Sequence, residues 1–360
     1  MDVFYYFSLF KEKRNAVKEI ICLQQYPKVT LLGSAMILSA LAGRVYRLNL
    51  QIEYVTAHGY LSLYTGEMLE NLNFPLWTRG SGTIILVGYL LFLYSFPKRK
   101  TFIKISGVFL FSLFFESLMG GRAGFISGIL AILYFYIRFY KVMLKIKYII
   151  IVFSIIIIFS IWISFKRQGI NTYSILTDTL IEFIHGQSVS IMIPFEVIEE
   201  FGRFKNHPYP FIFQPIFKWG YDIFYHGAPF SKTVLEKYND MAAIVGHSMD
   251  PFVYNTKGLS VGSAVLGEMY DCGGFFGVIF WSAFLAVFIK AVEKNILLKN
   301  SYIPFLWFVI NGIILAPRAQ MFGFVYQLWY VFCGFILIYF INFIFYPKKM
   351  NINYKNIHTL

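Results

Sequence analysis

The sequence predicts an all-α, polytopic integral membrane protein with about eight transmembrane helices and one large loop on one side of the membrane. Of its 360 residues, 58% are hydrophobic and only 14% are charged, and the mean hydropathy is +0.60. A soluble domain carries about 25% charged residues. Apolar runs long enough to cross a bilayer recur along the chain, and clusters of Lys and Arg separate them.

The spans are predicted from the length of each apolar run, since a crossing helix takes about 20 residues. Residues 44–79 are expected to form a mixed loop with aromatic side chains typical of a membrane interface. Residues 175–198 are too polar for a lipid-facing helix, so we expect an interfacial or re-entrant helix there. The predicted spans are 29–43, 80–96, 102–119, 123–137, 148–165, 261–289, 303–315 and 324–346.

These spans divide the chain into five parts. A first bundle of about five helices covers 29–165, and a second bundle of three helices covers 261–346. The large outer loop, 166–260, joins them, and segments 1–28 and 347–360 are terminal. The segments assigned to the inner side carry 19 Lys and Arg, against 5 in the short outer segments. Because short cytoplasmic segments collect Lys and Arg, both termini are predicted to be cytoplasmic.

Arginine and lysine divide unequally between the two sides. Lysine prevails on the inner side, where the only arginines are Arg14, Arg99 and Arg138. Arginine is favoured on the outer side, and its planar guanidinium binds phosphate through paired hydrogen bonds. The outer arginines are Arg44, Arg47, Arg79, Arg122, Arg167, Arg203 and Arg318. We therefore expect a site for a phosphate-bearing ligand at the outer leaflet, and the net charge of +13 needs no nucleic-acid partner.

Arg122 lies in the Gly-Gly-Arg-Ala-Gly sequence at 120–124, between two predicted spans. The glycines expose backbone N–H groups and Arg122 adds a fixed charge, which together would seat an anion at a helix N-terminus. Close helix packing is the alternative for Gly120, Gly124 and Gly128, which lie four residues apart. Packing does not need a charge, so the functional interpretation concentrates on Arg122.

Three further basic residues are candidates for binding phosphate. Lys166 and Arg167 follow the fifth span, and Arg318 lies in a short hairpin between the last two spans. Each would bind a phosphate group, or would instead reach out to lipid headgroups. These two alternatives use the same chemistry, and the sequence leaves both open.

Two pairs of polar residues in the outer loop are candidates for sugar binding and for proton transfer. His185 and Gln187 lie on the polar face of an apolar helix, which would line a sugar site or simply face solvent. His247 and Asp250 are three residues apart, and a histidine oriented by a carboxylate is a general-base arrangement. Ordinary turn chemistry before a proline is the alternative for the second pair.

Acidic residues within the predicted spans lie at the outer level as well. Glu116 is near the outer end of the third span, and Glu268 and Asp271 lie one helical turn apart near the outer end of the sixth. A carboxylate in partly apolar surroundings has a raised pKa, so Glu268 would act as a base. An ion pair with Arg122 or Arg318 is the alternative.

Several familiar motifs do not occur in the sequence. It contains no Walker A sequence, no H-E-x-x-H and no Asp-x-Asp pair, and the outer histidines lack ligand spacing. The three cysteines are scattered and predict no disulfide framework. A G-x-S-x-G match at 258–262 precedes a predicted membrane helix. Close helix packing explains its glycines better than the strand–turn–helix elbow of a serine hydrolase does. We expect no metal, no cofactor and no nucleotide-sugar donor.

Four stretches, together with one large outer loop, occur in an order that is typical of a known family. They are Gly120-Gly121-Arg122-Ala123-Gly124-Phe125, His185-Gly186-Gln187-Ser188, Gly246-His247-Ser248 and residues 258–274, which include Gly262-Ser263-Ala264 and Glu268-Met269-Tyr270. In these features, over roughly residues 113–277, the chain resembles the Wzy family of O-antigen polymerases.

The resemblance implies a GT-C-like glycosyltransferase of the inner membrane, with loop 166–260 in the periplasm. A growing glycan on undecaprenyl diphosphate would be transferred onto the non-reducing sugar of a new lipid-linked repeat unit. The outer basic residues would stabilise charge on the diphosphate, and a carboxylate or His247 would accept the proton of the attacking hydroxyl. The implied partners are the lipid-linked oligosaccharide, membrane lipid and a chain-length regulator protein.

Two other functions fit the same architecture. An O-antigen ligase would join the glycan to a lipid A core, and its loss would leave no repeat unit on the core. A lipid-linked oligosaccharide flippase would place charges along a pathway through both leaflets, whereas the charges here are predicted to gather at one leaflet.

Overall fold

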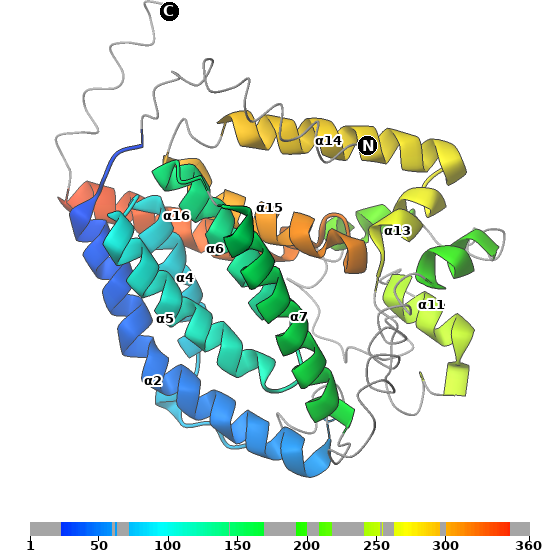
Figure 1. The fold of residues 1–360 in the computed structure, drawn as a ribbon, viewed down its shortest axis with the longest axis horizontal. Coiled ribbons are helices and arrows are strands. Elements are labelled where there is room, and N and C mark those ends of the chain that lie inside the picture. The colour runs from blue at the N-terminus through cyan, green and yellow to red at the C-terminus, as the bar shows by residue number, and fades with distance from the viewer. Residues whose placement is uncertain are drawn as a thin grey trace, which may run out of the picture.

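The computed structural model describes residues 23–59, 62, 72–143, 145–168, 192–199, 209–217, 241–252, 254, 263–295 and 300–345. Regular structure in these residues is entirely helical (Figure 1), which confirms the predicted all-α class. Six helices are long and apolar enough to cross a membrane.

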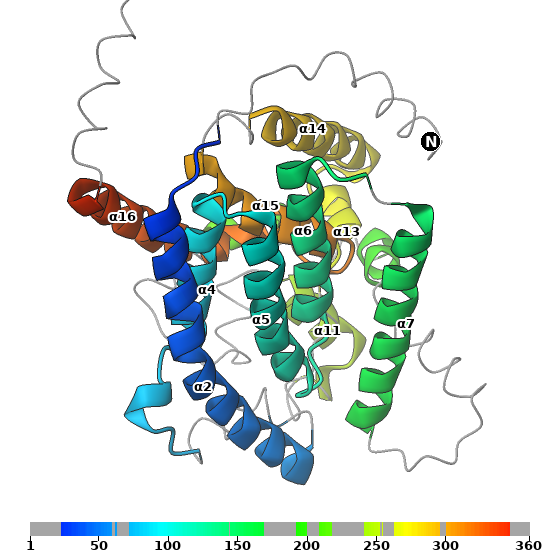
Figure 2. The ribbon, with the colours of Figure 1, turned by 60° about the vertical axis from the view of Figure 1, so that its left-hand side comes forward.

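Five helices from the N-terminal half form a bundle. Figure 2 shows them standing side by side; α14 (Gly274–Asn295) lies above them, and α16 (Leu328–Phe345) lies beside the upper ends of α2 and α4. The bundle helices are α2 (Pro27–His58), α4 (Ser81–Tyr94), α5 (Arg99–Ser117), α6 (Ala123–Tyr140) and α7 (Ile146–Gln168). The eighth long element is α15 (Ile303–Leu315), which packs on α4 and α6.

The shorter elements connect the long helices or belong to the outer loop. They are η2 (Leu76–Thr78), η4 (Phe211–Phe213), α11 (Met241–Met249), α13 (Val265–Asp271), η5 (Asn300–Tyr302), η6 (Ala316–Arg318) and η7 (Gly323–Gln327).

The closest helix pair is the antiparallel pair α2 and α4. A Cβ atom at Gly33 would lie 2.7 Å from the carbonyl oxygen of Gly88 and 2.8 Å from the backbone nitrogen of Phe92. Only glycine permits this approach, because a larger residue would meet backbone that cannot turn aside. In lipid, helices associate through such close van der Waals contact, since the surrounding chains are as apolar as the side chains.

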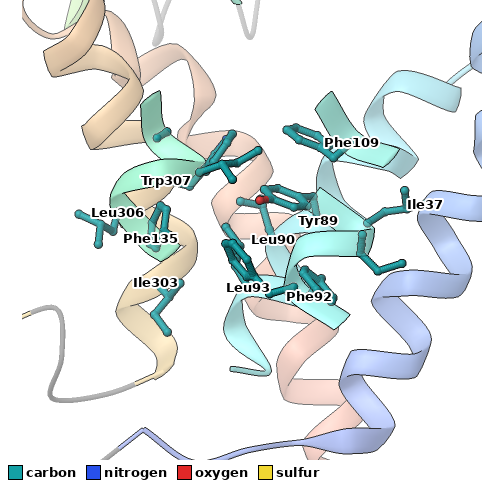
Figure 3. Packing of buried hydrophobic residues seen from close by; sticks show 14 of the residues in the cluster. Ile37, Tyr89, Leu90, Phe92, Leu93, Phe109, Phe135, Ile303, Leu306 and Trp307 are labelled. Atoms are coloured by element: carbon teal, nitrogen blue, oxygen red, sulfur yellow. The ribbon is translucent and has the colours of Figure 1, made fainter. Parts of the chain in front are cut away.

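Aromatic rings fill the centre of the bundle (Figure 3). The fully buried ring of Tyr89 stacks on Phe109 at 4.0 Å between centroids and meets the edge of Trp307 at 5.0 Å. Its hydroxyl shares a hydrogen bond of 3.0 Å with Ser106, so the polar tip is satisfied inside the bundle. Phe135 of α6 packs on the other side of Trp307, which joins α15 to the N-terminal helices.

The buried side-chain amide of Asn300 joins three segments at the upper end of the bundle. The side-chain nitrogen of Asn300 donates to the carbonyl oxygens of Gln24, at 2.8 Å, and Tyr94, at 2.6 Å. Its oxygen accepts from the backbone nitrogen of Gln24 at 3.0 Å. The start of α2, the end of α4 and the start of α15 therefore lie together.

The first span is longer than the sequence predicts. Residues 29–43 were expected to cross the membrane and 44–79 to form a loop, but α2 continues through Arg44 to His58 and is 32 residues long. No glycine or proline interrupts residues 44–58, and Arg, Leu, Gln and Glu are good helix formers. At about 48 Å, the helix is longer than the roughly 30 Å hydrocarbon core that a perpendicular helix has to cross.

The sixth predicted span is broken rather than continuous. The expected helix over 261–289 is divided into α13 and α14 at Cys272–Gly273, and Gly274 adopts a left-handed conformation with φ of +60°. Gly277 approaches the carbonyl oxygen of Met269 so closely that a side chain would not fit. Glu268 and Asp271 therefore belong to a short separate helix and not to the end of a transmembrane one.

The number of membrane crossings remains a prediction of about eight. Eight long helices occur among the described residues near the predicted spans, and six of them meet the length and composition of a span. The other two are α5, which carries charged residues at both ends, and α15, which has 13 residues. Most of the predicted outer loop and of the segment 175–198 lies outside the described residues.

Candidate functional site

A fully buried carboxylate organises the region around α13. Glu268 has no exposed surface, and its Oε1 accepts a hydrogen bond of 2.7 Å from the hydroxyl of Ser263. Its Oε2 accepts a bond of 2.9 Å from the backbone nitrogen of Met321, 53 residues along the chain. Both oxygens act as acceptors, as those of an ionised carboxylate do. Glu268 therefore fixes the turn after α15, which contains Arg318, against α13.

Apolar side chains from residues 193–245 and from the turn after α15 pack against α13. Met241 of α11, Val197 and Phe211 belong to one buried cluster with Ala264. On the opposite side, Val265 and Met269 pack with Ile212, Ala316 and Met321 in a second cluster. A side chain at Gly267 would collide with the methyl end of Met241, which lies against this position. Four segments distant in sequence thus converge on one seven-residue helix.

A second polar group lies beside this helix. The side-chain oxygen of Gln214 accepts hydrogen bonds of 2.7 Å from the amide of Gln320 and from the hydroxyl of Tyr326. Gln214 is fully buried, and its side-chain nitrogen has no partner among the described residues. A buried donor without an acceptor costs about 1–3 kcal/mol, which makes this nitrogen a position where a ligand oxygen would be stabilised.

Asp271 holds a further part of the outer loop. Its Oδ2 accepts a hydrogen bond of 2.9 Å from the backbone nitrogen of Phe211, the first residue of η4. The two carboxylates predicted to share a helix face therefore hold two different segments, the turn after α15 and the segment that leads to Gln214. Their described contacts position the backbone around α13.

The histidine of α11 is more accessible than these carboxylates. His247 is half-buried, and its ring packs edge-on against Tyr254 at 5.5 Å between centroids. Asp250 is exposed just beyond the end of α11. The hydroxyl of Ser248 is buried and has no partner in the described part of the chain. Of the predicted proton-transfer residues, His247 and Asp250 are reachable by a substrate in this conformation.

Arg122 lies in a different part of the molecule. It precedes α6, and its Nη1 donates a hydrogen bond of 3.1 Å to the carbonyl oxygen of Ser160 in α7. Lys166 and Arg167 come six and seven residues later on α7, about 9 Å along the helix axis. These three basic residues therefore belong to one end of the bundle. In Figures 1 and 2 the turn before α6 lies at the lower end of the bundle, well below α13.

The chain matches the family described as O-antigen polysaccharide polymerase Wzy over residues 3–351, nearly its whole length. It belongs to the Wzy family. No curated protein and no solved structure matches it in two further comparisons. Membership and the apolar helices make this a multi-pass membrane protein with a role in polymerising O-antigen, and the family implies a lipid-linked oligosaccharide substrate.

The predicted site residues of this Wzy protein are described to different extents. For Arg318, Lys166 and Arg167 the structure describes the backbone, in η6 and in α7, and not the side chain. His185 and Gln187 lie outside the described residues. Because the turn of Arg122 lies below α13, the expected grouping of Arg122 with Glu268 and Asp271 is not seen, and the depth of the Arg167 and Arg318 side chains remains a prediction.

Four polar residues around α13 were not predicted as site residues, because their sequence context gives only weak signals. Ser263 stands in the Gly-Ser-Ala stretch that carries part of the family resemblance, and Gln320 follows Arg318 closely. Gln214 and Tyr326 are single polar residues within apolar stretches, and nothing in their spacing predicts that they meet. Within the described ranges, no group of three or more His, Cys, Asp and Glu gathers as metal ligands would.

Proposed function

We propose that this Wzy protein extends O-antigen at the periplasmic face of the inner membrane. A growing glycan leaves its undecaprenyl diphosphate, and the non-reducing sugar of a new lipid-linked repeat unit receives it. The observation that carries the proposal is the convergence of outer-loop segments and the Arg318 turn on α13, fixed by Glu268. In the proposal, Arg318, the buried amide of Gln214 and the accessible His247 act together around this short helix.

The proton of the attacking hydroxyl goes to His247 in this proposal, and Asp250 orients the imidazole. A general base must reach the hydroxyl, and His247 has exposed surface whereas Glu268 has none. Glu268 is better suited to a positioning role, because its two oxygens already accept hydrogen bonds from Ser263 and Met321. It holds the turn of Arg318 in place.

The diphosphate of the leaving lipid requires positive charge where its own negative charge develops. Arg318 is the proposed contact beside α13, and Arg122, Lys166 and Arg167 are proposed contacts at the lower end of the bundle. His185 and Gln187 are proposed to bind the sugars. A chain-length regulator protein is the proposed partner, and both termini are proposed to be cytoplasmic.

Lipopolysaccharide banding tests the proposal. In a strain lacking the gene, a lost polymerase leaves one repeat unit on the core, and complementation restores the ladder of lengths. Arg318→Gln and His247→Gln should each leave mainly single repeats, with polymer formation at least about a hundredfold lower for His247→Gln, as for the loss of a general base. A deletion strain with no repeat on the core would show a ligase instead.

Arg138→Gln is the matched control for Arg318→Gln. Arg138 lies in the last turn of α6, at the end away from Arg122, and contacts Tyr134 in a cation–π pair. This variant should retain the full ladder. Each variant is compared at equal protein level in the membrane fraction, so that loss of folding is separated from loss of activity. A normal ladder from Arg318→Gln would rule out its contact with the diphosphate.

A further inference from the structure

Three arginines gather where α2 projects past α4. Arg44 and Arg47 lie on one face of α2, and Arg79 precedes the first turn of α4. Arg79 directly follows η2, whose Trp77 packs against Gly43 of α2, next to Arg44. The described contacts offer one carboxylate to this group, Glu116, which pairs with Arg44 at 2.6 Å. Within the described ranges, three positive charges therefore meet one negative charge in this group.

Arg47 is held in place by contacts that leave part of its guanidinium unused. Its Cζ lies 4.5 Å from the centre of the Phe74 ring, in a cation–π contact. Its Nε is buried and has no hydrogen-bond partner among the described residues. A buried, charged donor without an acceptor is costly, and an anion at this position would relieve the cost.

The N-terminus of α4 faces the same group. Arg44 packs against its first turn so closely that a Cβ at Gly82 would lie 3.0 Å from Nη1. Gly80 adopts the left-handed conformation, with φ of +75°, and no side chain caps the helix. The hydroxyl of Ser81 is buried and is without a partner in the described chain. Uncapped N–H groups and a free hydroxyl complement an anion.

Exposed apolar side chains beside the arginines indicate that the anion belongs to a molecule held in the membrane. Leu76 is 77% exposed and Trp77 is 60% exposed, and Trp77 packs on the half-exposed ring of Tyr46 at 5.3 Å. Trp and Tyr favour the membrane–water interface. Arg44 lies about 26 Å along α2 from Pro27, close to the thickness of the hydrocarbon core. The arginines therefore lie at headgroup level with apolar side chains next to them.

We propose that Arg44, Arg47 and Arg79, with the first turn of α4, bind the phosphate group of a membrane-anchored lipid. The guanidinium groups and the helix N-terminus hold the phosphate, and the lipid chain lies along Leu76 and Trp77. Either an isoprenoid diphosphate or a glycerophospholipid supplies this chemistry. The site is separate from α13, so its test does not depend on the proposed polymerase mechanism.

Binding of defined probes to the full-length protein in neutral detergent tests this site. Native mass spectrometry measures the bound fraction of farnesyl diphosphate, dioctanoyl phosphatidic acid and inorganic phosphate. At least one of the two lipids should bind the unmodified protein, and Arg47→Gln with Arg79→Gln should weaken that binding about tenfold or more. Preference for farnesyl diphosphate would identify an isoprenoid substrate, and equal binding of both would identify a general phosphate-lipid site.

Arg79→Gln alone keeps the test informative if the double variant fails to fold, because Arg79 is exposed and precedes the helix. It should weaken lipid binding while the circular dichroism spectrum stays unchanged. Arg138→Gln, near the other end of the bundle, should bind as the unmodified protein does. Unchanged lipid binding in both arginine variants would overturn the proposal, and inorganic phosphate binding as tightly as either lipid would overturn the lipid assignment.

Discussion

At the scale of single residues, a few polar side chains connect segments that are distant in the sequence. Asn300 binds Gln24 and Tyr94, the latter 206 residues away, and Glu268 joins α13 to Met321. Such groups are buried in largely apolar surroundings, where an unsatisfied donor or acceptor is expensive. Each therefore selects one arrangement of its neighbours.

We expect Asn300→Ala to destabilise the protein by about 2–4 kcal/mol, because two carbonyl oxygens and one N–H lose their partner together. Thermal unfolding of the protein in detergent measures the change. Asn49→Ala is the matched control, since the Asn49 amide donates to Glu53 on the exposed surface of α2 and should change stability by less than about 0.5 kcal/mol. Equal effects at both positions would contradict the role given to Asn300.

At the scale of elements, glycine decides how closely helices approach. Gly33 permits backbone contact between α2 and α4, and Gly274 with Gly277 permits the sharp break between α13 and α14. The break moves Glu268 out of the line of the following transmembrane helix and into contact with the outer loop. The geometry of the candidate site thus depends on glycines that carry no chemistry themselves.

Gly33→Ala should lower the free energy of unfolding by about 1–3 kcal/mol, because its Cβ would meet the backbone of α4 and force the two helices apart. Gly107→Ala in α5 is the control, since no atom lies within 4 Å of the added Cβ and the helix propensity rises. This control should be neutral or stabilising. Denaturation midpoints of the two variants provide the comparison, and a stabilised Gly33→Ala would show that α2 and α4 do not pack as described.

At the scale of the whole molecule, the ends of the bundle helices alternate between two levels. The start of α2, the end of α4 and the start of α15 meet at Asn300, while Arg44, Glu116 and the start of α4 meet at the opposite level. The commoner basic residue differs between the two levels: lysine prevails at the first and arginine at the second. Which of the two levels is cytoplasmic and which periplasmic remains a prediction.

Cysteine labelling tests that orientation. In a cysteine-free background, Gly121→Cys should react with a membrane-impermeant maleimide added from the periplasmic side, and Lys98→Cys should react only after the membrane is opened. The two positions flank α5 at opposite ends, Lys98 is exposed, and a Cβ at Gly121 meets no neighbour within 4 Å. The reverse pattern would place the arginine-rich level in the cytoplasm and contradict the proposed orientation.

The sequence alone determined the all-helical class, the approximate positions of the long apolar helices and the resemblance to the Wzy family. Hydropathy and charge are local properties, and one stretch of sequence is enough to express them. The same reasoning placed Glu268 and Asp271 on one helix face, because that relation also depends only on spacing.

Only the tertiary structure decided what those residues do. The partners of Glu268, the unused donor of Gln214 and the grouping of Arg47 with Arg79 arise between segments whose separation no periodicity encodes. The helix formers after Arg44 and the glycines at 273, 274 and 277 are local signals for the continuation of α2 and for the break before Gly274, but only the structure showed that these signals prevail over the apolar pattern. Spacing along one helix is fixed by covalent geometry, whereas contacts between helices are fixed by how whole surfaces pack.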